Sequence, residues 1–467
     1  MPFIGRTDEL QNLENLYGNR QANLIVIYGR RRVGKSTLIE KFIAKKTNLA
    51  FEGLEKTSTK NQIKQFTNEL SLQINEPLLK HASFQDWTAI FEYLTKYFES
   101  LKEKCILFLD EFQWLAVNQS KLVSLVKYYW DKHWSKQKVM LILCGSVSSY
   151  MIKRVICSKA LYGRINWELC LQPLQPNEIF QMLDGKRSQD EALLYAMIVG
   201  GIPKYLKEIN SNQSFDQNMN KLFFSTNGIF VNEYHRIFFS QFKEHKTYEA
   251  IVHSLRNNPL SLDDIAKAIK FTSGGGLKLY LENLEKSSFI TSYVPYNKSV
   301  NSKLIRYKLT DEYIRFYCKY IEPHIKLINT NPSKNLFSRL VKPVWQSWLG
   351  FAFENFCLKN AFYLTEIMGF SDQVLNWGPL FHQKDKGFQI DLVYVRQDNV
   401  ITVCELKYSS TPIGVDIIRE MDRKCSLITI PHGFTLEKAL ISRFGADASL
   451  TSLGYFNHII SGEDFFK

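Results

Sequence analysis

The residue pattern with the clearest chemical use is a glycine-rich loop at residues 29–37, which read Gly-Arg-Arg-Arg-Val-Gly-Lys-Ser-Thr. It fits the motif G-x-x-x-x-G-K-[ST], whose backbone N–H groups surround the phosphates of a nucleotide. An apolar run (23–28) precedes the loop and a helical pattern (38–43) follows it, as the motif requires. The lysine would contact the β- and γ-phosphates, and the serine hydroxyl would bind Mg²⁺. We therefore predict a site for ATP and Mg²⁺ that contains Gly29, Arg32, Val33, Gly34, Lys35, Ser36 and Thr37.

Two acidic residues that follow an apolar run (105–109) could complete the chemistry of this site. Asp110 can hold Mg²⁺, directly or through water, and Glu111 can polarise the attacking water. The alternative is an acidic pair that simply leaves a strand for solvent. Ser146, after the run 139–144, could contact the γ-phosphate or the water, or could belong to an ordinary Gly-Ser turn. We predict Ser36 and Asp110 as metal ligands, and Lys35, Glu111 and Ser146 as catalytic residues.

The elements that must position these residues alternate along the first part of the chain. Helical patterns separate five strand-like runs, which cover 23–28, 48–51, 105–109, 139–144 and 165–171. Such alternation is typical of an α/β domain, in which helices cover both faces of a parallel sheet.

A second group of chemically useful residues lies near the end of the chain. Asp391 is on a strand-like run (387–395), and Glu405 and Lys407 share one face of the next run (400–407). Two carboxylates and a lysine that converge at the end of a hairpin can bind Mg²⁺ and activate water for phosphodiester cleavage. Asp391 and Glu405 would be metal ligands, and Lys407 would orient or help to deprotonate the water. The alternative is that all three are ordinary exposed residues of an edge hairpin.

The middle of the chain has the pattern of three helices and a hairpin, an order that resembles a winged helix. The helical patterns cover 247–256, 260–266 and 277–286, and the strand-like runs cover 289–294 and 303–309. The third helix of such a domain can enter the major groove of DNA. Because this helix also carries Glu282 and Glu285, contact with DNA and a structural or regulatory role are equal alternatives. The basic candidates are Lys267, Lys270 and Lys278 on the helices and Lys298, Lys303 and Arg306 in the hairpin.

The first domain resembles AAA+-type ATPases, and in particular the archaeal-type ATPases of the STAND branch, the signal-transducing ATPases with numerous domains. Beyond the phosphate loop and the acidic pair, the matching segments are Phe3-Ile4-Gly5-Arg6 with Glu9-Leu10, Leu161-Tyr162-Gly163-Arg164 and Gly200-Gly201-Ile202-Pro203-Lys204-Tyr205-Leu206. The resemblance implies that Phe3, Gly5 and Arg6 lie near the adenine. It implies that Gly201 and Pro203, in a helical lid, contact the base. It makes Arg164 a candidate cation for the γ-phosphate, in cis or across a subunit interface, unless it is a solvated surface arginine.

The last domain resembles the core of PD-(D/E)xK nucleases through Asp391, Glu405 and Lys407. Gly350-Phe351-Ala352-Phe353-Glu354-Asn355-Phe356 looks like the leading helix of that core, and the resemblance implies Glu354 as one more metal ligand. Ile390 stands where a proline often precedes the aspartate. Together the domains resemble archaeal-type ATPases with a C-terminal DUF234 domain. The implied arrangement is an ATPase at 1–240 (core 1–175, lid 176–240), a winged helix at 241–328 and a restriction-endonuclease-like α/β domain at 336–467.

Composition narrows the class of partner. The 467 residues carry a formal net charge of +13, which favours a polyanionic partner such as DNA. The alternative is a soluble protein with a mildly basic surface. None of the eight cysteines forms a C-x-x-C pair, the N-terminus lacks a signal-peptide pattern, and no apolar run could span a bilayer. We expect a cytoplasmic protein, with a homo-oligomer as one option, in which an ATP-hydrolysing switch is coupled to a DNA-binding, nuclease-like domain. The alternative is a nucleotide-dependent regulator or scaffold whose last domain binds nucleic acid or protein without cleavage.

Overall fold

The structure is a computed structural model that describes residues 3–81, 84–116, 120–146, 150–242, 244–272, 274–294, 305–330, 335–382 and 388–467. The chain forms two compact units. The first contains 1–172 with 241–243, and the second contains 173–240 with 244–467. The division falls beside the predicted end of the ATPase core (1–175), so the predicted lid segment packs within the second unit.

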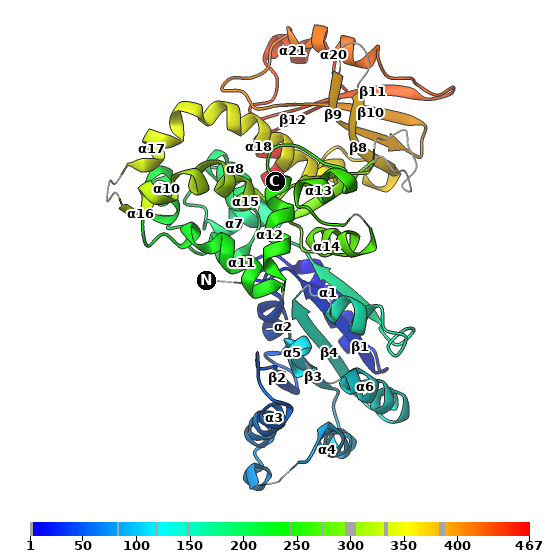
Figure 1. The fold of residues 1–467 in the computed structure, drawn as a ribbon. Coiled ribbons are helices and arrows are strands. Elements are labelled where there is room, and N and C mark those ends of the chain that lie inside the picture. The colour runs from blue at the N-terminus through cyan, green and yellow to red at the C-terminus, as the bar shows by residue number, and fades with distance from the viewer. Residues whose placement is uncertain are drawn as a thin grey trace. The chain divides into compact units, whose positions relative to one another are not determined.

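The first unit is built on a five-stranded parallel sheet (Figure 1). Its strands follow the five apolar runs, which favour a sheet that is buried on both faces. They are β1 (Asn23–Gly29), β2 (Asn48–Glu52), β3 (Cys105–Asp110), β4 (Val139–Ser146) and β5 (Trp167–Leu171), in the order β2-β3-β4-β1-β5. All four pairings are parallel, which confirms the predicted sheet. Because β1, β3 and β4 are neighbours, the loops after them meet at one edge of the sheet.

Helices cover both faces of this sheet. Ile25 and Ile27 of β1 pack in one core cluster with residues of α1 (Thr7–Gly18) and α2 (Lys35–Ile43). Leu24 and Val26 point to the other face, where residues of three further helices form a second cluster. These are α3 (Thr59–Gln73), α4 (Trp87–Ser100) and α6 (Ser120–Lys132), and the short helix α5 (Phe112–Leu115) follows β3.

The second unit begins with the helices predicted as a lid. They are α7 (Pro176–Met182), α8 (Gln189–Val199), α9 (Pro203–Leu206), α10 (Phe215–Phe223) and α11 (Glu233–Gln241). Helix α8 packs against α15 (Glu312–Phe316) and α18 (Trp345–Lys359), which lie more than 100 residues further along the chain. The lid helices therefore share a core with later segments.

The middle of the chain has the predicted order of elements, three helices and an antiparallel pair of strands. They are α12 (His245–Ser254), α13 (Leu262–Ala268), α14 (Gly275–Lys286), β6 (Ile290–Tyr293) and β7 (Arg306–Leu309). Leu260 also pairs with Tyr307 of β7. Ser261 caps α13, because its hydroxyl oxygen accepts the Asp264 N–H at 3.2 Å. Helix α14 begins two residues before the predicted start, because Gly274 supplies the N-cap. Lys298 and Lys303 lie outside the described residues.

A five-stranded mixed sheet ends the chain. Its strands are β8 (Val374–His382), β9 (Phe388–Arg396), β10 (Val400–Lys407), β11 (Thr435–Ser442) and β12 (His458–Ser461), in the order β12-β11-β10-β9-β8. Strands β8 to β10 are antiparallel, and β10 to β12 are parallel. The remaining α-helices of the second unit are α16 (Ile325–Thr330), α17 (Leu336–Leu340), α18, α19 (Ala361–Ile367), α20 (Ile417–Cys425) and α21 (Ala448–Ser452).

Helices also flank this second sheet. Met421 of α20 and Leu450 of α21 pack in one core cluster with Val393 of β9 and Val403 of β10. Helix α18 contacts β9 and β10, and the Tyr394 hydroxyl of β9 donates to the Ala361 carbonyl at 2.7 Å. All eight cysteines are free thiols. Every helix in the described part of the chain is too short or too polar to cross a membrane.

Candidate functional site

The phosphate loop connects β1 to α2 with the backbone that its glycines allow. Gly34 has a φ of 96°, a left-handed conformation that suits glycine, directly before α2. A Cβ atom at Gly29 would lie 2.6 Å from the Leu171 carbonyl oxygen, so the loop passes β5 without room for a side chain. Lys35 is buried, and its ammonium donates to the carbonyls of Gly29 at 3.2 Å and Arg30 at 3.1 Å. The lysine thus folds back over the loop that would hold the phosphates.

The predicted magnesium ligands meet beside this loop. The Ser36 hydroxyl at the start of α2 donates to the Asp110 carboxylate at the end of β3, over 2.5 Å. The other carboxylate oxygen of Asp110 accepts the Glu111 N–H at 2.8 Å. Glu111 has a φ of 45°, so the chain turns sharply after the strand. These bonds fix the orientation of Asp110 toward the loop.

A glutamine that no sequence motif selects joins the other two predicted catalytic residues. The Gln113 amide donates to the Glu111 carboxylate and, at 3.3 Å, to the Ser146 hydroxyl. Gly145 leaves space for it, because a Cβ there would overlap with the Gln113 amide oxygen. The acidic pair after β3 and the serine at the end of β4 are therefore connected through one side chain. In the sequence, the available indication that Gln113 contacts Glu111 is that it lies two residues further along the chain.

The three arginines between the loop glycines have different surroundings. Arg30 is buried, whereas Arg31 lies 3.9 Å from the Glu111 carboxylate and 5.2 Å from the centre of the Trp114 ring. Arg32 has a φ of 71° and an exposed side chain. Arg31 thus places a positive charge beside a predicted catalytic residue.

The N-terminal segment is attached to the nucleotide site through Arg6. Its guanidinium donates to the Val33 carbonyl of the phosphate loop at 3.3 Å and to the Gln172 carbonyl after β5 at 2.6 Å. Phe3 packs at the edge of the core formed with α1 and α2, and Gly5 has a φ of 69°. The three residues predicted to lie near the adenine are therefore on a segment bound to the loop.

Arg164 is engaged elsewhere in the first unit. Its guanidinium forms a bidentate pair with Asp131 of α6, over 2.6 and 2.9 Å, and the hydrogen bonds from Arg164 lower the pKa of Asp131 to about 2. A third bond goes to the Tyr162 carbonyl at 3.1 Å. Its role as a cation for the γ-phosphate stays a prediction, and it requires release from Asp131.

The Gly201–Pro203 turn belongs to the second unit, where it is tightly packed. The Leu174 N–H donates to the Gly201 carbonyl at 2.7 Å, and a Cβ at Gly201 would overlap with the Leu174 carbonyl oxygen. Pro203 opens α9, a position where its missing N–H costs nothing. These contacts give both residues a structural role, and their contact with a base stays a prediction.

The residues of the first unit suit the two groups that the sequence predicted. A left-handed glycine turn before a helix N-terminus and an adjacent lysine match the chemistry of a triphosphate. Ser36 and Asp110 offer a hydroxyl and a carboxylate oxygen, which are the hard donors that Mg²⁺ prefers. Thr37 is exposed on α2.

In the second unit, the predicted carboxylates and lysine come together on β9 and β10. The Glu405 carboxylate is fully buried and lies 2.9 Å from the Lys407 ammonium. Asp391 is also buried, and its carboxylate accepts the Leu406 N–H at 3.3 Å. The three side chains therefore lie on the same part of the sheet, as the alternation of the strands predicted.

Helix α20 adds a second lysine that the sequence patterns did not indicate. The Lys424 ammonium lies 2.6 Å from the other oxygen of Glu405, so each oxygen of this carboxylate faces a cation. Glu420, one turn earlier, lies 3.4 Å from Lys424 and 3.3 Å from Lys407. The available signal was the spacing Glu420-x-x-x-Lys424, which places both on one helix face without indicating what that face meets.

Burial raises the pKa values of two acidic residues at this site, Asp391 and Glu354. Burial, reinforced by the neighbouring Glu405, raises the pKa of Asp391 to about 6. Burial also raises the pKa of Glu354 on α18, and four nearby cations oppose the rise: Lys308, Arg315, Lys407 and Lys424. Lys308 of β7 and Arg315 of α15 come from the middle of the chain. The carboxylate site thus lies in the electrostatic field of residues from three segments.

Three hydrogen-bonded contacts hold α18 against the end of the middle region. The Arg315 guanidinium donates to the Phe351 carbonyl at 3.3 Å. Asn355 donates to the Thr310 carbonyl at 2.9 Å, and Lys359 pairs with the Glu312 carboxylate at 2.7 Å. Phe351, Asn355 and Lys359 are four residues apart and therefore share one face of the helix. The helix that carries Glu354 is fixed on that face to Thr310 and to α15.

The donors of this second site do not form a metal cage as they stand. Asp391 and Glu405 have the right oxygen atoms, but both oxygens of Glu405 already face ammonium groups. Among the described residues, no three His, Cys, Asp or Glu side chains are grouped closely enough to hold a metal. The predicted Mg²⁺ ligands Glu354, Asp391 and Glu405 would need Lys424 to move.

The strand order, the loop and the acidic pair of the first unit define a P-loop ATPase domain of the AAA+ type. Residues 3–209 match the family model of an ATPase domain found predominantly in Archaea. Residues 317–420 match DUF234, a family of archaeal and bacterial proteins of unknown function. The chain therefore joins an archaeal-type ATPase domain to a DUF234 domain, as the resemblance implied. The second match covers Asp391, Glu405 and Lys407 and ends before Lys424.

Similar proteins include one of nearly the same extent. An uncharacterized protein of Methanocaldococcus jannaschii is 27% identical over 431 residues, which cover 91% of this chain and 92% of that protein. An uncharacterized ATP-binding protein of the same organism is 52% identical over 44 residues, 9% of this chain and 75% of that protein. Among solved structures, a Walker-type ATPase of Pyrococcus abyssi is 19% identical and covers 68% of this chain and 96% of its own, with a TM-score of 0.49.

Proposed function

We propose that the protein is an ATP-hydrolysing switch that controls a DNA-binding, nuclease-like site in its C-terminal domain. The observation that carries the second half of this proposal is the convergence of Asp391, Glu405 and Lys407 on neighbouring strands. Acidic side chains beside lysines suit a phosphodiester substrate, because the ammonium groups attract the phosphate. The formal net charge of +13 agrees with a polyanionic partner.

The chemistry of the ATP site follows from the positions of its side chains. Lys35 can exchange its bonds to two backbone carbonyls for bonds to phosphate oxygens. Ser36 and Asp110 would hold Mg²⁺, whose charge offsets that of the phosphates. Glu111 would orient the attacking water and accept its proton, while Gln113 keeps the Glu111 carboxylate in place.

Hydrolysis can be separated from simple binding with two variants. Glu111→Gln keeps the size of the side chain but removes the carboxylate, so nucleotide should bind without turnover. Lys35→Ala should weaken binding itself. If Glu111→Gln supports every ATP-dependent function of the parent chain, the switch works by binding alone and the hydrolytic part of the proposal is wrong.

The nuclease-like site is tested by cleavage of plasmid, linear and single-stranded DNA with Mg²⁺ or Mn²⁺, with and without ATP. Glu405→Ala and Lys407→Ala should both abolish cleavage, and Lys438→Ala on the neighbouring strand β11 is the matched control. No cleavage by the parent chain under any of these conditions, with normal ATP turnover, would contradict nuclease activity.

A second function, binding without cleavage, is favoured by one observation. Lys407 and Lys424 neutralise both oxygens of Glu405, so the site in its described form offers cations rather than a metal cage. In this case the protein is a nucleotide-dependent regulator or scaffold. Lys424→Ala then weakens DNA binding measured by fluorescence anisotropy, whereas cleavage is absent from all variants.

A further inference from the structure

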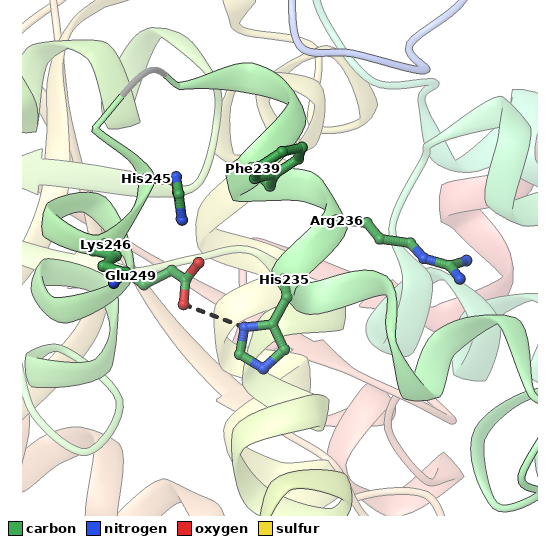
Figure 2. A pocket seen from close by; sticks show the side chains of 6 residues that line it. All are labelled: His235, Arg236, Phe239, His245, Lys246 and Glu249. Carbon is green, nitrogen blue, oxygen red and sulfur yellow. Dashed lines mark hydrogen bonds and ion pairs between the residues drawn. The ribbon is translucent and has the colours of Figure 1, made fainter.

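A groove between α11 and α12 shares no residue with either candidate site. One cavity of about 370 Å³ is lined by His235, Arg236, Phe239, His245, Lys246 and Glu249 (Figure 2). A second cavity of about 410 Å³ shares His235 and Glu249 with it and continues along α12 to His253. Together they form one groove, and each cavity is in the range of sites for small organic ligands. We name it the α11–α12 groove.

An exposed aromatic ring forms part of the wall. The Phe239 side chain is 64% exposed, which is unusual for a large apolar side chain. Its ring meets the His245 ring edge to face, with centroids 5.4 Å apart. Most of the Phe239 side chain therefore stays exposed at the wall of the groove.

The charges around this ring favour an anion. The carboxylate of Glu249 already accepts from His235 across the groove, with 3.2 Å between Nδ1 and Oε2. Arg236 and Lys246 are exposed, and neither has an ion pair with another described residue. Figure 2 shows these two cations on opposite sides of the His235–Glu249 pair. The second cavity contains Glu322, but that carboxylate lies 3.5 Å from His253 and 3.7 Å from Arg256.

We propose that the α11–α12 groove binds single-stranded nucleic acid, with a base stacked on Phe239 and neighbouring phosphates on Arg236 and Lys246. An exposed aromatic ring between cations is the combination that single-strand binding proteins use. Duplex DNA hides the faces of its bases, so it offers nothing to stack on this ring. This inference rests on the proposed nucleic-acid partner but not on cleavage.

The test measures binding of the full chain to a fluorescent oligothymidylate of about 16 nucleotides by anisotropy. Phe239→Ala should weaken binding about tenfold, whereas Phe239→Tyr keeps the ring and should bind like the parent chain. Phe362→Ala, which removes another exposed ring, is the matched control. The urea unfolding curve of every variant should equal that of the parent, which shows that the variants are folded.

The cations are tested by the double variant Arg236→Glu/Lys246→Glu. It should bind more weakly. The slope of the logarithm of the binding constant against the logarithm of the salt concentration should become smaller by about 0.7 for each phosphate that the variant no longer neutralises. Lys60→Glu/Lys64→Glu on α3 makes the same change of net charge at two exposed lysines and should keep that slope.

Two results would overturn the inference. One is an unchanged Kd for both groove variants, and the other is an equal weakening of duplex and single-strand binding by Phe239→Ala. Abolished cleavage in Glu405→Ala with retained single-strand binding would support it. Its failure is therefore distinguishable from the failure of the nuclease site.

Discussion

The two lysine-containing sites of this protein hold their cations in opposite ways. In the phosphate loop, Lys35 donates to the backbone carbonyls of Gly29 and Arg30. In the C-terminal domain, Lys407 and Lys424 face the two oxygens of one buried carboxylate, Glu405. The first lysine can turn to a phosphate and leave behind neutral carbonyls. Lys407 and Lys424 cannot move away from Glu405 without leaving its buried negative charge uncompensated.

The two sites differ in the free energy that is needed to free their lysines for a ligand. Breaking hydrogen bonds to carbonyls costs little when a phosphate replaces them. A buried carboxylate that loses its cation suffers a large penalty, unless a metal or a proton takes the place of that cation. The ATP site is therefore ready to bind, whereas the C-terminal site requires a rearrangement around Lys424.

The largest effect is expected at Lys35, because its ammonium can turn from two neutral carbonyls to a phosphate. Lys35→Ala should lower ATP turnover about 100- to 1,000-fold, because charge on the transferred phosphoryl group loses a preorganised cation. Phosphate release measures the effect, and Lys41→Ala, an exposed lysine on the same helix, is the control. Turnover within a few-fold of the parent would mean that another cation has this role.

The next effect tests whether the charges of the C-terminal site depend on one another. Glu405→Ala leaves Lys424 buried beside Lys407 without this carboxylate, which should lower the free energy of unfolding by about 3–5 kcal/mol. The double variant Glu405→Gln/Lys424→Met removes both charges and should recover most of this stability. Urea unfolding followed by tryptophan fluorescence measures both.

The control for this experiment is a surface ion pair elsewhere in the second unit. Glu208→Ala breaks the pair between Glu208 and Lys204, whose atoms are 3.0 Å apart, and should cost less than about 1 kcal/mol. Equal destabilisation by Glu405→Ala and Glu208→Ala would contradict the view of Glu405 as a buried, mutually stabilised centre.

A smaller effect is expected from the protonation of Asp391, which makes the free energy of unfolding depend on pH. Its pKa is raised from 3.8 to about 6, so the folded protein holds this proton at pH values where the unfolded chain has released it. Stability from this group therefore falls as the pH rises from about 4 to about 6 and is constant above. Asp391→Asn should be more stable than the parent at pH 7.5 by about 2 kcal/mol, and much less so at pH 4.5.

Urea unfolding at the two pH values measures this difference. Asp372→Asn removes an exposed carboxyl group before β8 and should show the same free energy of unfolding as the parent at both. If Asp391→Asn destabilises the protein at pH 7.5, the ionised Asp391 is stabilised by its surroundings rather than strained by burial. A gain of stability together with abolished DNA cleavage would identify Asp391 as a residue kept for function.

How much the sequence could predict differs between the two sites for a physical reason. The phosphate loop is one contiguous segment, so the spacing of Gly29, Gly34 and Lys35 already contains its geometry. The strands of the first sheet and their parallel type followed from buried apolar runs that alternate with helices. In the C-terminal site, the alternation of β10 placed Glu405 and Lys407 on one face. These parts depend on local backbone geometry, which periodicity indicates directly.

The contacts that the sequence did not predict join distant segments. Lys424 reaches Glu405 from a helix position that no motif covers, and Lys308 enters the same field from the middle region. Arg164 carried a family signature, yet its bidentate pair with Asp131 had no signal in sequence spacing. Tertiary packing decides these partners, and one sequence without the fold does not indicate which helix faces which sheet.

The smallest effect is expected at Gln113, which touches the two predicted catalytic residues without being one. Gln113→Ala removes the amide between Glu111 and Ser146, so Glu111 loses its fixed orientation. We expect kcat for ATP hydrolysis to fall about tenfold with KM unchanged, because only the alignment of the base is affected. Gln11→Ala, on the exposed surface of α1, is the control.

An independent route to the same displacement is Gly145→Ala. The added Cβ would overlap with the Gln113 amide oxygen and lie 3.0 Å from the Met151 sulfur, so Gln113 must move. The kcat of Gly145→Ala should fall as in Gln113→Ala. The double variant should have a kcat no lower than that of either single variant, since both substitutions act on one interaction. Additive effects would show that Gly145 supports the site through Met151 instead. A change in KM rather than kcat would mean that Gln113 acts on the nucleotide and not on Glu111.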